Sequence, residues 1–596
     1  MNIARRNRSN VFSTARLSRI GLSILLLALL ACRSSADDLG PWIATEQNIA
    51  STRLLRNLLS DGAVIASPST ANPDYYYHWV RDGALTMDVV VSFYAAAPDQ
   101  ATRDQYLALL TTYLDFSRAL QTTNNPSSLM GRGLGEPKFI TDGSPYLGNW
   151  GRPQDDGPAL RAASLCRLAN LLLDNGRPDL VNLVKSKLYD SVLPTNSLIK
   201  RDLEYVSHNW NLTCVDLWEE SSGDHFYTKI VQRRALREGA RLATRLSDPG
   251  AAQWYSAQST ALETAIQGHW DPNRGILVGT LNQQGPTDQN GNEYKTSGLD
   301  VAVVLGVLHA SFPGDDFFAA TDDQVLATTQ KLVAAFNAPG FYNINGTKQD
   351  AQGNALGPAI GRYPEDRYYG GNPWFLCTGA IAELYYRAAN LWDAKGTLAV
   401  TAANKAFFSS LDASRFSALQ PGQTLTRTDP AFTDILSAIR NAGDAELRRI
   451  KYHTAVDGSL SEQMNRDTGF EMSAADLTWS YASILTAAWQ RQGTTMTHAV
   501  PPPAHLAASL PEPSGRSRRL RSIPSFAKPL NRAGVPVVAT QKVASRTNRS
   551  TQPADTAPNT NPQMEQRLSR IEKAINRLSD ELKSSRSNAS PKAPPK

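Results

Sequence analysis

The sequence predicts an all-α fold, and three observations lead to this prediction. First, residues 42–492 contain about fourteen segments in which apolar side chains recur at the spacing of one helix face. Second, several segments end in a Gly or Asn of the kind that terminates helices, as at Asn175-Gly176. Third, the alternation of apolar and polar residues that is typical of strands is scarce. A hydrophobic content of 41% provides enough apolar side chains for a large core.

The expected helices follow one another along the chain. The clearest covers residues 103–120, where the apolar positions lie on one helix face: Tyr106, Leu109, Leu110, Tyr113, Leu114 and Leu120. The others begin near Glu46, Arg81, Gly157, Pro178, Ser197, Phe226, Gln253, Leu299, Asp322, Pro373, Thr397, Asp429 and Ser473. Long polar or Gly-rich loops lie at 124–157, 275–298 and 345–371. We expect these loops to meet at one end of a scaffold of paired helices, where function tends to be located.

The N-terminus has the composition of an export signal. Residues 1–32 contain five Arg and no acidic residue, and they include an apolar run, 20–31, that is too short for a comfortable membrane span. The residues Leu29-Leu30-Ala31-Cys32 resemble a bacterial lipobox, in which Cys32 would carry a lipid anchor; plain cleavage after Ala36 is the alternative. Residues 1–36 are therefore predicted to be a signal segment of an exported protein, either secreted, periplasmic or membrane-anchored as a lipoprotein.

The C-terminal region differs sharply in composition from the rest. Residues 496–562 are rich in Pro, Ser and basic residues, which predicts a disordered linker. Residues 563–585 then predict a short helix with a heptad seam, and 586–596 a disordered end. The seam consists of Met564, Leu568, Ile571, Ile575, Leu578 and Leu582. A coiled coil that joins copies of the chain and a monomeric surface helix both remain open.

Charge and motifs exclude several classes of function. The net charge of +6 comes from the two basic ends, so the middle of the chain is net acidic and argues against nucleic-acid binding. The sequence has no Walker loop, no His-Glu-x-x-His and no Gly-x-Ser-x-Gly, and its four Cys lack metal-ligand spacing. We therefore expect neither a metal nor a cofactor.

Aromatic residues stand beside charged ones in three loop segments. They are Tyr75-Tyr76-Tyr77-His78-Trp79-Val80-Arg81-Asp82, Gly148-Asn149-Trp150-Gly151-Arg152-Pro153-Gln154, and the segment 361–374. Rings that pack on C–H faces and charged groups that bind hydroxyls are what a pyranose requires. Each segment read alone is also compatible with ordinary loop packing and an ordinary ion pair.

Residues 209–223 place acidic residues among Trp rings. Asp216, Trp218, Glu219 and Glu220 lie within five positions. A carboxyl held against an apolar ring has a raised pKa and can act as a general acid. Alternatively, these residues could form the first turn of a helix, where acidic side chains lie near the positive end of the helix dipole. Glu462 lies in a turn-rich stretch before the last helix. Its local sequence, taken by itself, is typical of a surface acid.

Taken together, these stretches resemble the fungal-type glucoamylases of glycoside hydrolase family 15. The resemblance extends from 42 to 492 in matching order. It is carried by YYYHWVRDGAL, WGRPQDDGPALRA, CVDLWEE, GRYPEDRYYGGNPWFLCT and GSLSEQMNRDTGFEMSAADLTWSYASILTA. It implies an (α/α)6 barrel, a toroid of six helical hairpins with an active site built from long loops, over residues 40–495. Many relatives carry a C-terminal starch-binding domain rich in Trp, but here no Trp follows Trp489.

The same resemblance implies roles for individual residues. Glu219 matches the general acid and Glu462 the general base of an inverting pair, whose carboxyls are expected about 6.5–9.5 Å apart. Asp216, placed one helical turn before Glu219, is expected to tune the site. Residues expected to contact the substrate are Tyr75, Trp79, Arg81, Asp82, Trp150, Trp218, Glu220, Arg362, Tyr363, Asp366 and Trp374. Among them, Arg81, Asp82 and Arg362 would hold the terminal glucose.

The implied function is an exo-acting glycoside hydrolase that releases β-glucose from the non-reducing ends of α-1,4-glucans, which would be its partner. Two alternatives stay open at this point. One is a related inverting barrel enzyme that acts on α-1,6-glucan or trehalose. The other is a catalytically silent carbohydrate-binding protein.

Overall fold

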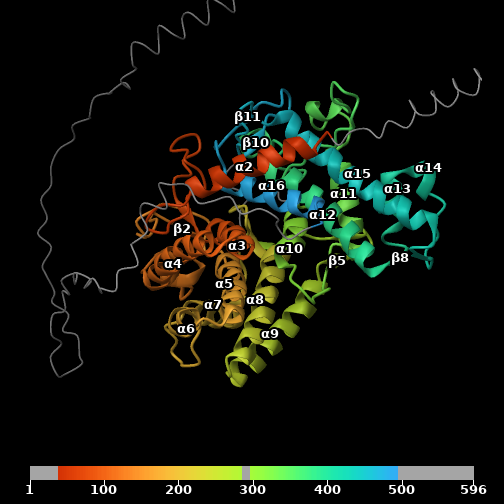
Figure 1. The fold of residues 1–596 in the computed structure, drawn as a ribbon. Coiled ribbons are helices and arrows are strands. Elements are labelled where there is room, and N and C mark those ends of the chain that lie inside the picture. Colours follow the sequence, from red (N-terminus) through yellow and green to blue (C-terminus); the bar gives the residue numbers. More distant parts are fainter. Residues whose placement is uncertain (1–37, 285–294, 494–596) are drawn as a thin grey trace, which may run out of the picture. The chain divides into compact units, whose positions relative to one another are not determined.

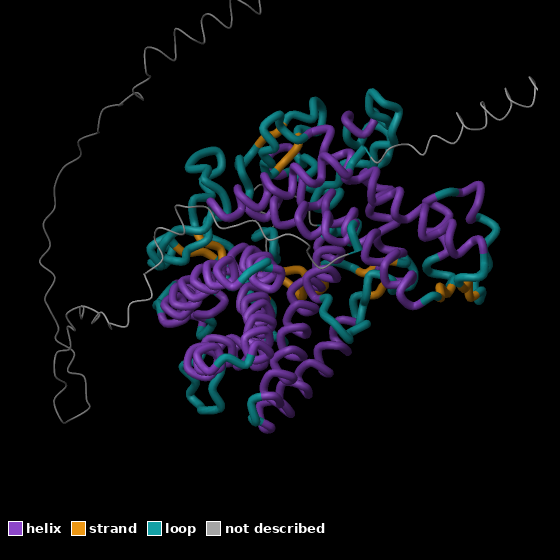
Figure 2. Tube along the Cα trace, viewed as in Figure 1, coloured by secondary structure: helices purple, strands orange, loops and turns teal. Residues whose placement is uncertain are grey.

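A computed structural model describes residues 38–284 and 295–493 of the chain (Figure 1). The chain divides into two units, Met1–Ser514 and Gly515–Lys596, and every described residue belongs to the first. Figure 2 shows that helices dominate this unit and that strands are short segments within the connections.

Fifteen α-helices are described. They are α2 (Gly40–Arg56), α3 (Val80–Ala96), α4 (Gln100–Thr122), α5 (Asp156–Asn175), α6 (Pro178–Leu183), α7 (Leu198–Asn209), α8 (Phe226–Arg245), α9 (Pro249–Gln267), α10 (Ala302–Ala310), α11 (Asp323–Phe336), α12 (Phe375–Lys395), α13 (Lys405–Leu411), α14 (Ala413–Phe416), α15 (Pro430–His453) and α16 (Thr478–Arg491). A π-helical turn, Val184–Leu188, continues α6.

Six of these helices form a closed inner ring. Each inner helix contacts the next one in the order α3, α5, α8, α10, α12 and α16, and α16 contacts α3 to close the ring. Each inner helix also packs against an outer one, in the pairs α3–α4, α5–α7, α8–α9, α10–α11, α12–α15 and α16–α2. This arrangement is the (α/α)6 barrel that the resemblance implies, and the all-α prediction is confirmed.

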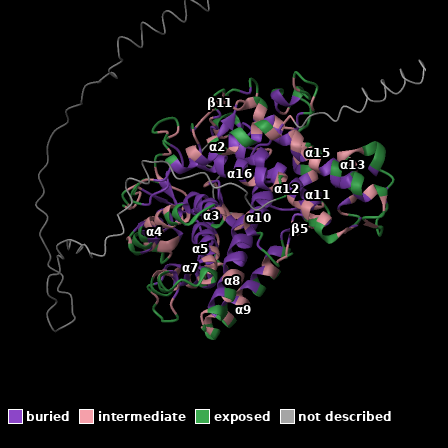
Figure 3. Ribbon diagram, viewed as in Figure 1, coloured by how far each residue is buried: buried purple, intermediate pink, exposed green. Residues whose placement is uncertain are grey.

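Burial distinguishes the two rings (Figure 3). On the outer helix α9 the buried residues are Tyr255, Ser259, Leu262 and Ile266, which form one stripe. On the inner helix α10 every residue except His309 is buried, as expected for a helix packed on all sides. Local signals agree with these helices: Asp99 accepts a hydrogen bond from the Thr102 amide at the start of α4, and Gly176 ends α5 in the left-handed conformation.

The strands are short and lie between the helices. They are β1 (His78–Trp79), β2 (Lys138–Phe139), β3 (Cys214–Val215), β4 (Ser222–His225), β5 (Trp270–Asp271), β6 (Ile276–Leu277), β7 (Thr280–Gln284), β8 (Thr397–Ala399), β9 (Thr424–Thr426), β10 (Gln463–Met464) and β11 (Glu471–Met472). The 3₁₀ turns are Pro126–Met130, Gly133–Gly135, Asn343–Gly346 and Tyr368–Gly370. All pairings are antiparallel: β1 with β2, β3 with β4, β4 with β7, β5 with β6, β8 with β9, and β10 with β11.

The aromatic and acidic segments occupy equivalent places in this topology. Each one directly precedes an inner helix: 75–79 precedes α3, 148–154 precedes α5, 216–225 precedes α8, 361–374 precedes α12, and 462–472 precedes α16. The connections that lead into the inner helices of one ring meet at the same end of the barrel. The topology therefore explains why motifs spread over almost 400 residues form one cluster.

The structure corrects some of the expected element boundaries. The helix expected near Thr397 is wrong, because residues 397–399 form β8 and α13 begins only at Lys405. The helix expected near Ser473 begins at Thr478, and the one near Glu46 begins at Gly40. The predicted signal segment, linker and heptad helix lie outside the described residues. Among the described helices, none is both long and apolar enough to cross a membrane.

Two carboxyls of the fold give stability a dependence on pH. Burial is the main cause that raises the pKa of Glu46, on α2, and of Glu471, in β11, from 4.5 to about 7. Between these values the folded protein holds more protons than the unfolded chain, so the free energy of unfolding falls as pH rises from about 4.5 to about 7. Glu46 is 2% exposed, and one of its oxygens, Oε1, has no hydrogen-bond partner among residues 38–284 and 295–493.

We therefore expect Glu46→Gln to flatten this dependence. An amide does not ionise. The free energy of unfolding of the variant should therefore fall by about 1–2 kcal/mol less than that of the parent between pH 4.5 and pH 7. Thermal unfolding followed by circular dichroism from pH 4.5 to pH 8 measures the slope. The exposed Asp434, changed to Asn, is the control and should retain the parental slope. An equal slope in all three proteins would contradict the assignment.

Candidate active site

Glu219 lies in a tight turn between β3 and β4, not on a helix. The Asp216 amide donates to the Ser221 carbonyl, and the Glu219 amide donates to the Asp216 carbonyl, so residues 216–221 fold back on themselves. Glu219 itself has φ 69°, in the left-handed region. The expectation that Asp216 stands one helical turn before Glu219 is thus wrong, because the strand pairing of β3 with β4 replaces the helix and α8 begins only at Phe226.

The Glu219 carboxylate is surrounded by N–H donors. Its Oε1 accepts hydrogen bonds from Trp79 Nε1 at 2.7 Å and from Gln154 Nε2 at 3.1 Å. Arg81 Nη2 lies 3.6 Å from the same oxygen. Gly151 brings the preceding loop against this turn, because a Cβ at that position would lie 3.0 Å from the Glu219 carbonyl oxygen. The side chain remains 18% exposed and can be reached by a substrate.

Glu462 precedes β10 and is almost fully buried, at 1% exposure. Pairing of β10 with β11 brings Ser473 beside it, and the Ser473 hydroxyl donates to Glu462 Oε2. Gln463 Nε2 donates to the same oxygen at 3.1 Å. Burial raises the pKa of Glu462 to about 7, against the lowering effect of the Ser473 and Tyr75 hydroxyls and of Arg362.

The two carboxyls have different surroundings. The sequence argument places the raised pKa at the Trp-Glu-Glu motif, where a ring was expected to desolvate Glu219. In the structure Glu219 meets N–H donors, while Glu462 is the desolvated carboxyl. Hydrogen bonds to the charged form are therefore what allows Glu462 to ionise.

Tyr75 and Trp79 connect the surroundings of the two carboxyls. Their rings are in edge contact, with centroids 5.4 Å apart. Trp79 donates to Glu219, and the hydroxyl of Tyr75 faces Glu462 and lies 2.8 Å from the Tyr368 hydroxyl. Burial, followed by the charge of Glu462 and a weaker effect of Glu219, raises the pKa of Tyr75 well above its usual range. Glu219 and Glu462 thus border the same aromatic cluster.

Lys138 forms the other boundary of this cluster. The β1–β2 register places it opposite Trp79, and its Nζ lies 3.6 Å from the centre of the Trp150 ring. It also lies over Tyr77, Trp79 and Tyr146, at 4.0, 4.5 and 4.3 Å. Burial lowers the pKa of Lys138 to about 8. Its charge attracts the faces of these rings and fixes the orientation of Trp150.

Arg81 and Asp82 begin α3 beside the acid. Arg81 Nη1 donates to Gln154 Oε1 at 2.9 Å and to Asp156 Oδ2 at 3.1 Å, and the Arg81 side chain is 6% exposed. Asp82 lies 3.6 Å from Arg81 Nε, and burial raises the pKa of Asp82 to about 6. Arg81 is therefore held by acids of the protein on one side and remains next to Glu219 on the other.

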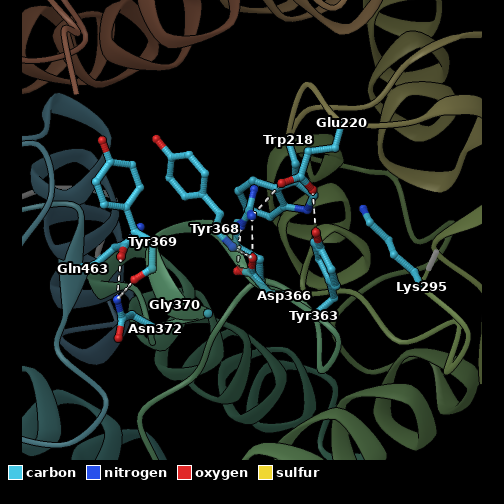
Figure 4. A network of polar contacts seen from close by, with 12 residues as sticks. Trp218, Glu220, Lys295, Tyr363, Asp366, Tyr368, Tyr369, Gly370, Asn372 and Gln463 are labelled. Atoms are coloured by element: carbon cyan, nitrogen blue, oxygen red, sulfur yellow. Dashed lines mark hydrogen bonds and ion pairs between the residues drawn. The ribbon is translucent and has the colours of Figure 1, made fainter. Parts of the chain in front are cut away.

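Arg362 lies at the centre of a second polar network, and Figure 4 labels three members of it, Glu220, Tyr363 and Asp366. Its Nη2 donates to Glu220 Oε1 at 2.7 Å and to Asp366 Oδ1 at 2.6 Å. Tyr363 donates from its hydroxyl to the other Glu220 oxygen at 2.6 Å. The guanidinium lies 5.0–5.3 Å from the centres of four rings: Trp218, Tyr363, Tyr368 and Trp374. Nη1 has no hydrogen-bond partner among the described residues, which leaves a donor for a ligand.

The structure brings all the predicted site residues into this one cluster, although Asp216 lies behind the turn at 1% exposure. Sequence reasoning missed five others: Lys138, Gln154, Asp156, Tyr368 and Ser473. Gln154, Asp156 and Tyr368 stand inside the aromatic motifs, so their position was a usable signal. Lys138 and Ser473 come close only through strand pairing and could not be found from local sequence.

A separate cavity of about 660 Å³ is lined by all six inner helices. Six of its charged side chains are paired with one another: Asp88 with Arg167, Arg234 with Glu238, and Glu383 with Arg387. None of the predicted site residues lines it. Trp479 lines this cavity and also stacks on Trp218, with ring centres 6.4 Å apart, so it separates the cavity from the site.

Comparison with known proteins identifies the family. The model of glycosyl hydrolases family 15 matches residues 44–489, which include every predicted site residue. The chain belongs to this family. A glucoamylase of Blastobotrys adeninivorans is 38% identical over 475 residues, which cover 77% of this chain and 73% of the relative. Glucoamylase-1 of Schizophyllum commune is 37% identical over 492 residues, which cover 80% and 78%.

Solved structures of family 15 agree with the barrel. The family 15 glucoamylase from Hypocrea jecorina superimposes with a TM-score of 0.67 at 36% identity and covers 80% of this chain and 76% of its own. The glucoamylase from Saccharomycopsis fibuligera gives a TM-score of 0.66 at 33% identity and covers 76% and 96%. Among residues 38–284 and 295–493, no group of three or more His, Cys, Asp or Glu is arranged to hold a metal ion.

The Ser473 hydroxyl leads to a prediction for the pH dependence of this family 15 enzyme. Ser473→Ala removes a donor to Glu462, so the pKa of Glu462 should rise further. We expect the acid limb of the kcat/KM profile on maltose to move to higher pH by about 1 unit or less. Ser480→Ala is the control, because Ser480 is a buried serine that donates to the Ser461 carbonyl and not to Glu462. A shift to lower pH, or the same shift in both variants, would contradict the role of Ser473.

Proposed function

We propose that Glu219 is the general acid and Glu462 the general base of an inverting hydrolysis. The chain is an exo-acting glycoside hydrolase, a glucan 1,4-α-glucosidase, that releases glucose from α-glucans. The observation that supports the two assignments is the Tyr75–Trp79 contact, because it joins the surroundings of the carboxyls that the family motifs single out.

The proposed reaction uses each carboxyl once. The bond between the anomeric carbon and the glycosidic oxygen breaks, and the leaving oxygen takes the proton of Glu219. Water attacks the anomeric carbon from the opposite face while its proton passes to Glu462. The products are β-glucose and a chain shorter by one unit. The Tyr75 hydroxyl, which faces Glu462, is placed to orient the attacking water.

Arg81, Asp82 and Arg362 are proposed to bind the hydroxyls of the terminal glucose. Among the described residues Arg362 Nη1 makes no hydrogen bond, so this arginine retains a donor for an acceptor outside the protein. Arg81 Nε is buried and lies 3.6 Å from Asp82, while its Nη2 lies next to Glu219. Trp150 Nε1 and Trp374 Nε1 are buried without hydrogen-bond partners in the part of the chain that the structure describes. Trp79 and Trp150 would provide ring faces for the C–H surface of the sugar.

Trp218, Glu220, Tyr363, Asp366 and Trp374 are proposed to bind the next sugar. They surround Arg362, and Glu220 follows the acid directly in the turn. Because Asp366 and Glu220 fix the guanidinium from two sides, this part of the site needs little reorganisation when the substrate binds. Asp216 is proposed to act on the turn rather than on the substrate.

Early hydrolysis products distinguish this proposal from the alternatives. Proton NMR of maltotriose hydrolysis should show β-glucose first, before mutarotation. An initial α-anomer would refute the inverting pair. Parallel rates on maltose, isomaltose and trehalose decide between an α-1,4-directed enzyme and a relative directed to α-1,6-glucan or trehalose. An absence of glucose release from all of them would favour a silent carbohydrate-binding protein.

Export of the enzyme is also a proposal, because it rests on residues outside the described ranges. The composition of residues 1–36 supports a signal segment, with either a lipid on Cys32 or plain cleavage after Ala36. The mass of the mature N-terminal peptide distinguishes the two. The heptad seam at 563–585 supports self-association, which sedimentation of the chain with and without residues 561–596 tests.

A further inference from the structure

The backbone of the proposed general acid has an unfavourable conformation. Glu219 has φ 69°, a region that residues with a side chain rarely adopt. Such a conformation persists where the surrounding structure holds it, and it is frequent at active sites. The groups that hold residues 216–221 are therefore part of how the acid is positioned.

The Asp216 carboxylate closes the turn from inside. Its Oδ1 accepts hydrogen bonds from the amides of Glu220 at 2.8 Å and Ser221 at 3.1 Å, the two residues that follow Glu219. Its Oδ2 accepts from the Ser221 hydroxyl at 3.3 Å. These bonds require the charge and the orientation of a carboxylate that is only 1% exposed.

Lys295 links the Asp216 carboxylate to that of Asp300. Its Nζ lies 2.8 Å from Asp216 Oδ2 and 2.6 Å from Asp300 Oδ2. Asp300 is fixed in turn, because its Oδ1 accepts from the Ala302 amide at the start of α10 at 2.8 Å. The same oxygen accepts from Trp218 Nε1 at 2.9 Å. Residues 216 and 218, on the N-terminal side of Glu219, are thus both anchored to one Lys–Asp pair in the connection that leads into the inner helix α10.

The balance of charge requires this lysine. Asp216 and Asp300 are 1% and 2% exposed, and Lys295 lies between them. Without a cation between them, the two buried carboxylates would repel each other, and Asp216 would lose its position inside the turn. Lys295 Nζ also lies 4.5 Å from the centre of the Tyr363 ring, whose hydroxyl binds Glu220, and Figure 4 shows Lys295 beside Tyr363.

We propose that Lys295, together with Asp300, is a positioning residue that holds the 216–221 turn so that Glu219 delivers its proton to the leaving oxygen. The proposal rests on the function proposed above. Lys295 does not touch the carboxyl of Glu219; it acts through Asp216 and Trp218. Its loss should therefore lower kcat on maltose through proton donation, whereas weaker binding of the next sugar at Glu220 and Tyr363 would raise KM.

Two substrates separate positioning of the acid from a general structural effect. Maltose needs a proton on its leaving oxygen, whereas α-glucosyl fluoride has a good leaving group and depends much less on the acid. Lys295→Met should lower kcat on maltose by about 10- to 100-fold, because a small misplacement of a catalytic group costs that much. On α-glucosyl fluoride the loss should stay within about 3-fold, since water activation by Glu462 is untouched. Lys295→Gln, which keeps N–H donors but not the charge, should show the same selectivity and serves if the Met variant does not fold.

Lys200→Met is the matched control, because Lys200 is a buried lysine paired with Asp248 at 2.6 Å, between α7 and the start of α9. It should leave the ratio of the two activities unchanged. Lys295→Arg restores the charge and should recover part of the activity on maltose. The proposal would be overturned if Lys295→Met and Lys295→Gln each lost activity equally on the two substrates, or if neither lost activity. If Glu219→Gln also lacked the selectivity, the acid assignment itself would fail, so the two failures are distinguishable.

Discussion

Glu219→Gln is expected to lower kcat on maltose by about 10²- to 10⁴-fold, because an amide cannot give up a proton to the leaving oxygen. Folding should be preserved. The amide is nearly isosteric and its oxygen can still accept the hydrogen bonds from Trp79 and Gln154. Activity on α-glucosyl fluoride should fall far less, since fluoride leaves without such assistance. Initial rates on the two substrates, together with a thermal unfolding curve, measure all three expectations.

Glu263→Gln is a suitable control for this substitution. Glu263 is a partly exposed carboxylate bonded to Arg233 at 2.8 Å, outside the cluster, and it should tolerate the change with normal rates on both substrates. Near-normal turnover of maltose by Glu219→Gln would refute the assignment of the acid. So would an equal loss on both substrates in a folded protein.

Glu462→Gln is expected to lower turnover of both maltose and α-glucosyl fluoride by about 10²-fold or more, because both reactions need an activated water. The contrast with Glu219→Gln follows from the order of the chemistry: the leaving group differs between the substrates, whereas the attacking water does not. The donors from Ser473 and Gln463 should keep the amide in place. Rates on both substrates at one pH give the comparison.

A second variant and a control make this prediction sharper. Glu462→Ala opens space for a small anion, so azide should restore turnover of α-glucosyl fluoride and give β-glucosyl azide as fluoride leaves. Glu446→Gln is the control, because burial raises the pKa of Glu446 as it does that of Glu462, and Glu446 is 2% exposed on α15, away from the cluster. A selective loss on maltose alone, or an α-configured azide product, would contradict the role of Glu462.

The helical scaffold could be predicted because its signals are local. The apolar stripe of residues 103–120, the left-handed Gly176 and the loops before each inner helix can all be recognised within one window of sequence. The failure at Thr397 has the same origin: Thr397–Ala399 pairs with Thr424–Thr426, and a partner 27 residues away cannot be read from a local pattern.

The site could be predicted only in part. Motifs identified residues that the fold gathers into one cluster, and the topology explains why they meet. The backbone of Glu219 could not be predicted, because its left-handed conformation depends on Asp216, Asp300 and Lys295 together. The surroundings of Glu219 could not be predicted either, because its N–H donors come from residues 79 and 154, far away in the sequence.

The closure of the inner ring has a consequence for synthesis of the enzyme. Helix α16 packs on α2 and α3, the first two described helices, and Glu462 lies in the connection that leads into α16. A nascent chain therefore lacks both the proposed base and the contact between its first and last hairpins until about residue 491 has left the ribosome. Hydrolysis should begin abruptly when that segment emerges, and fragments that stop earlier should neither close nor cleave glucan.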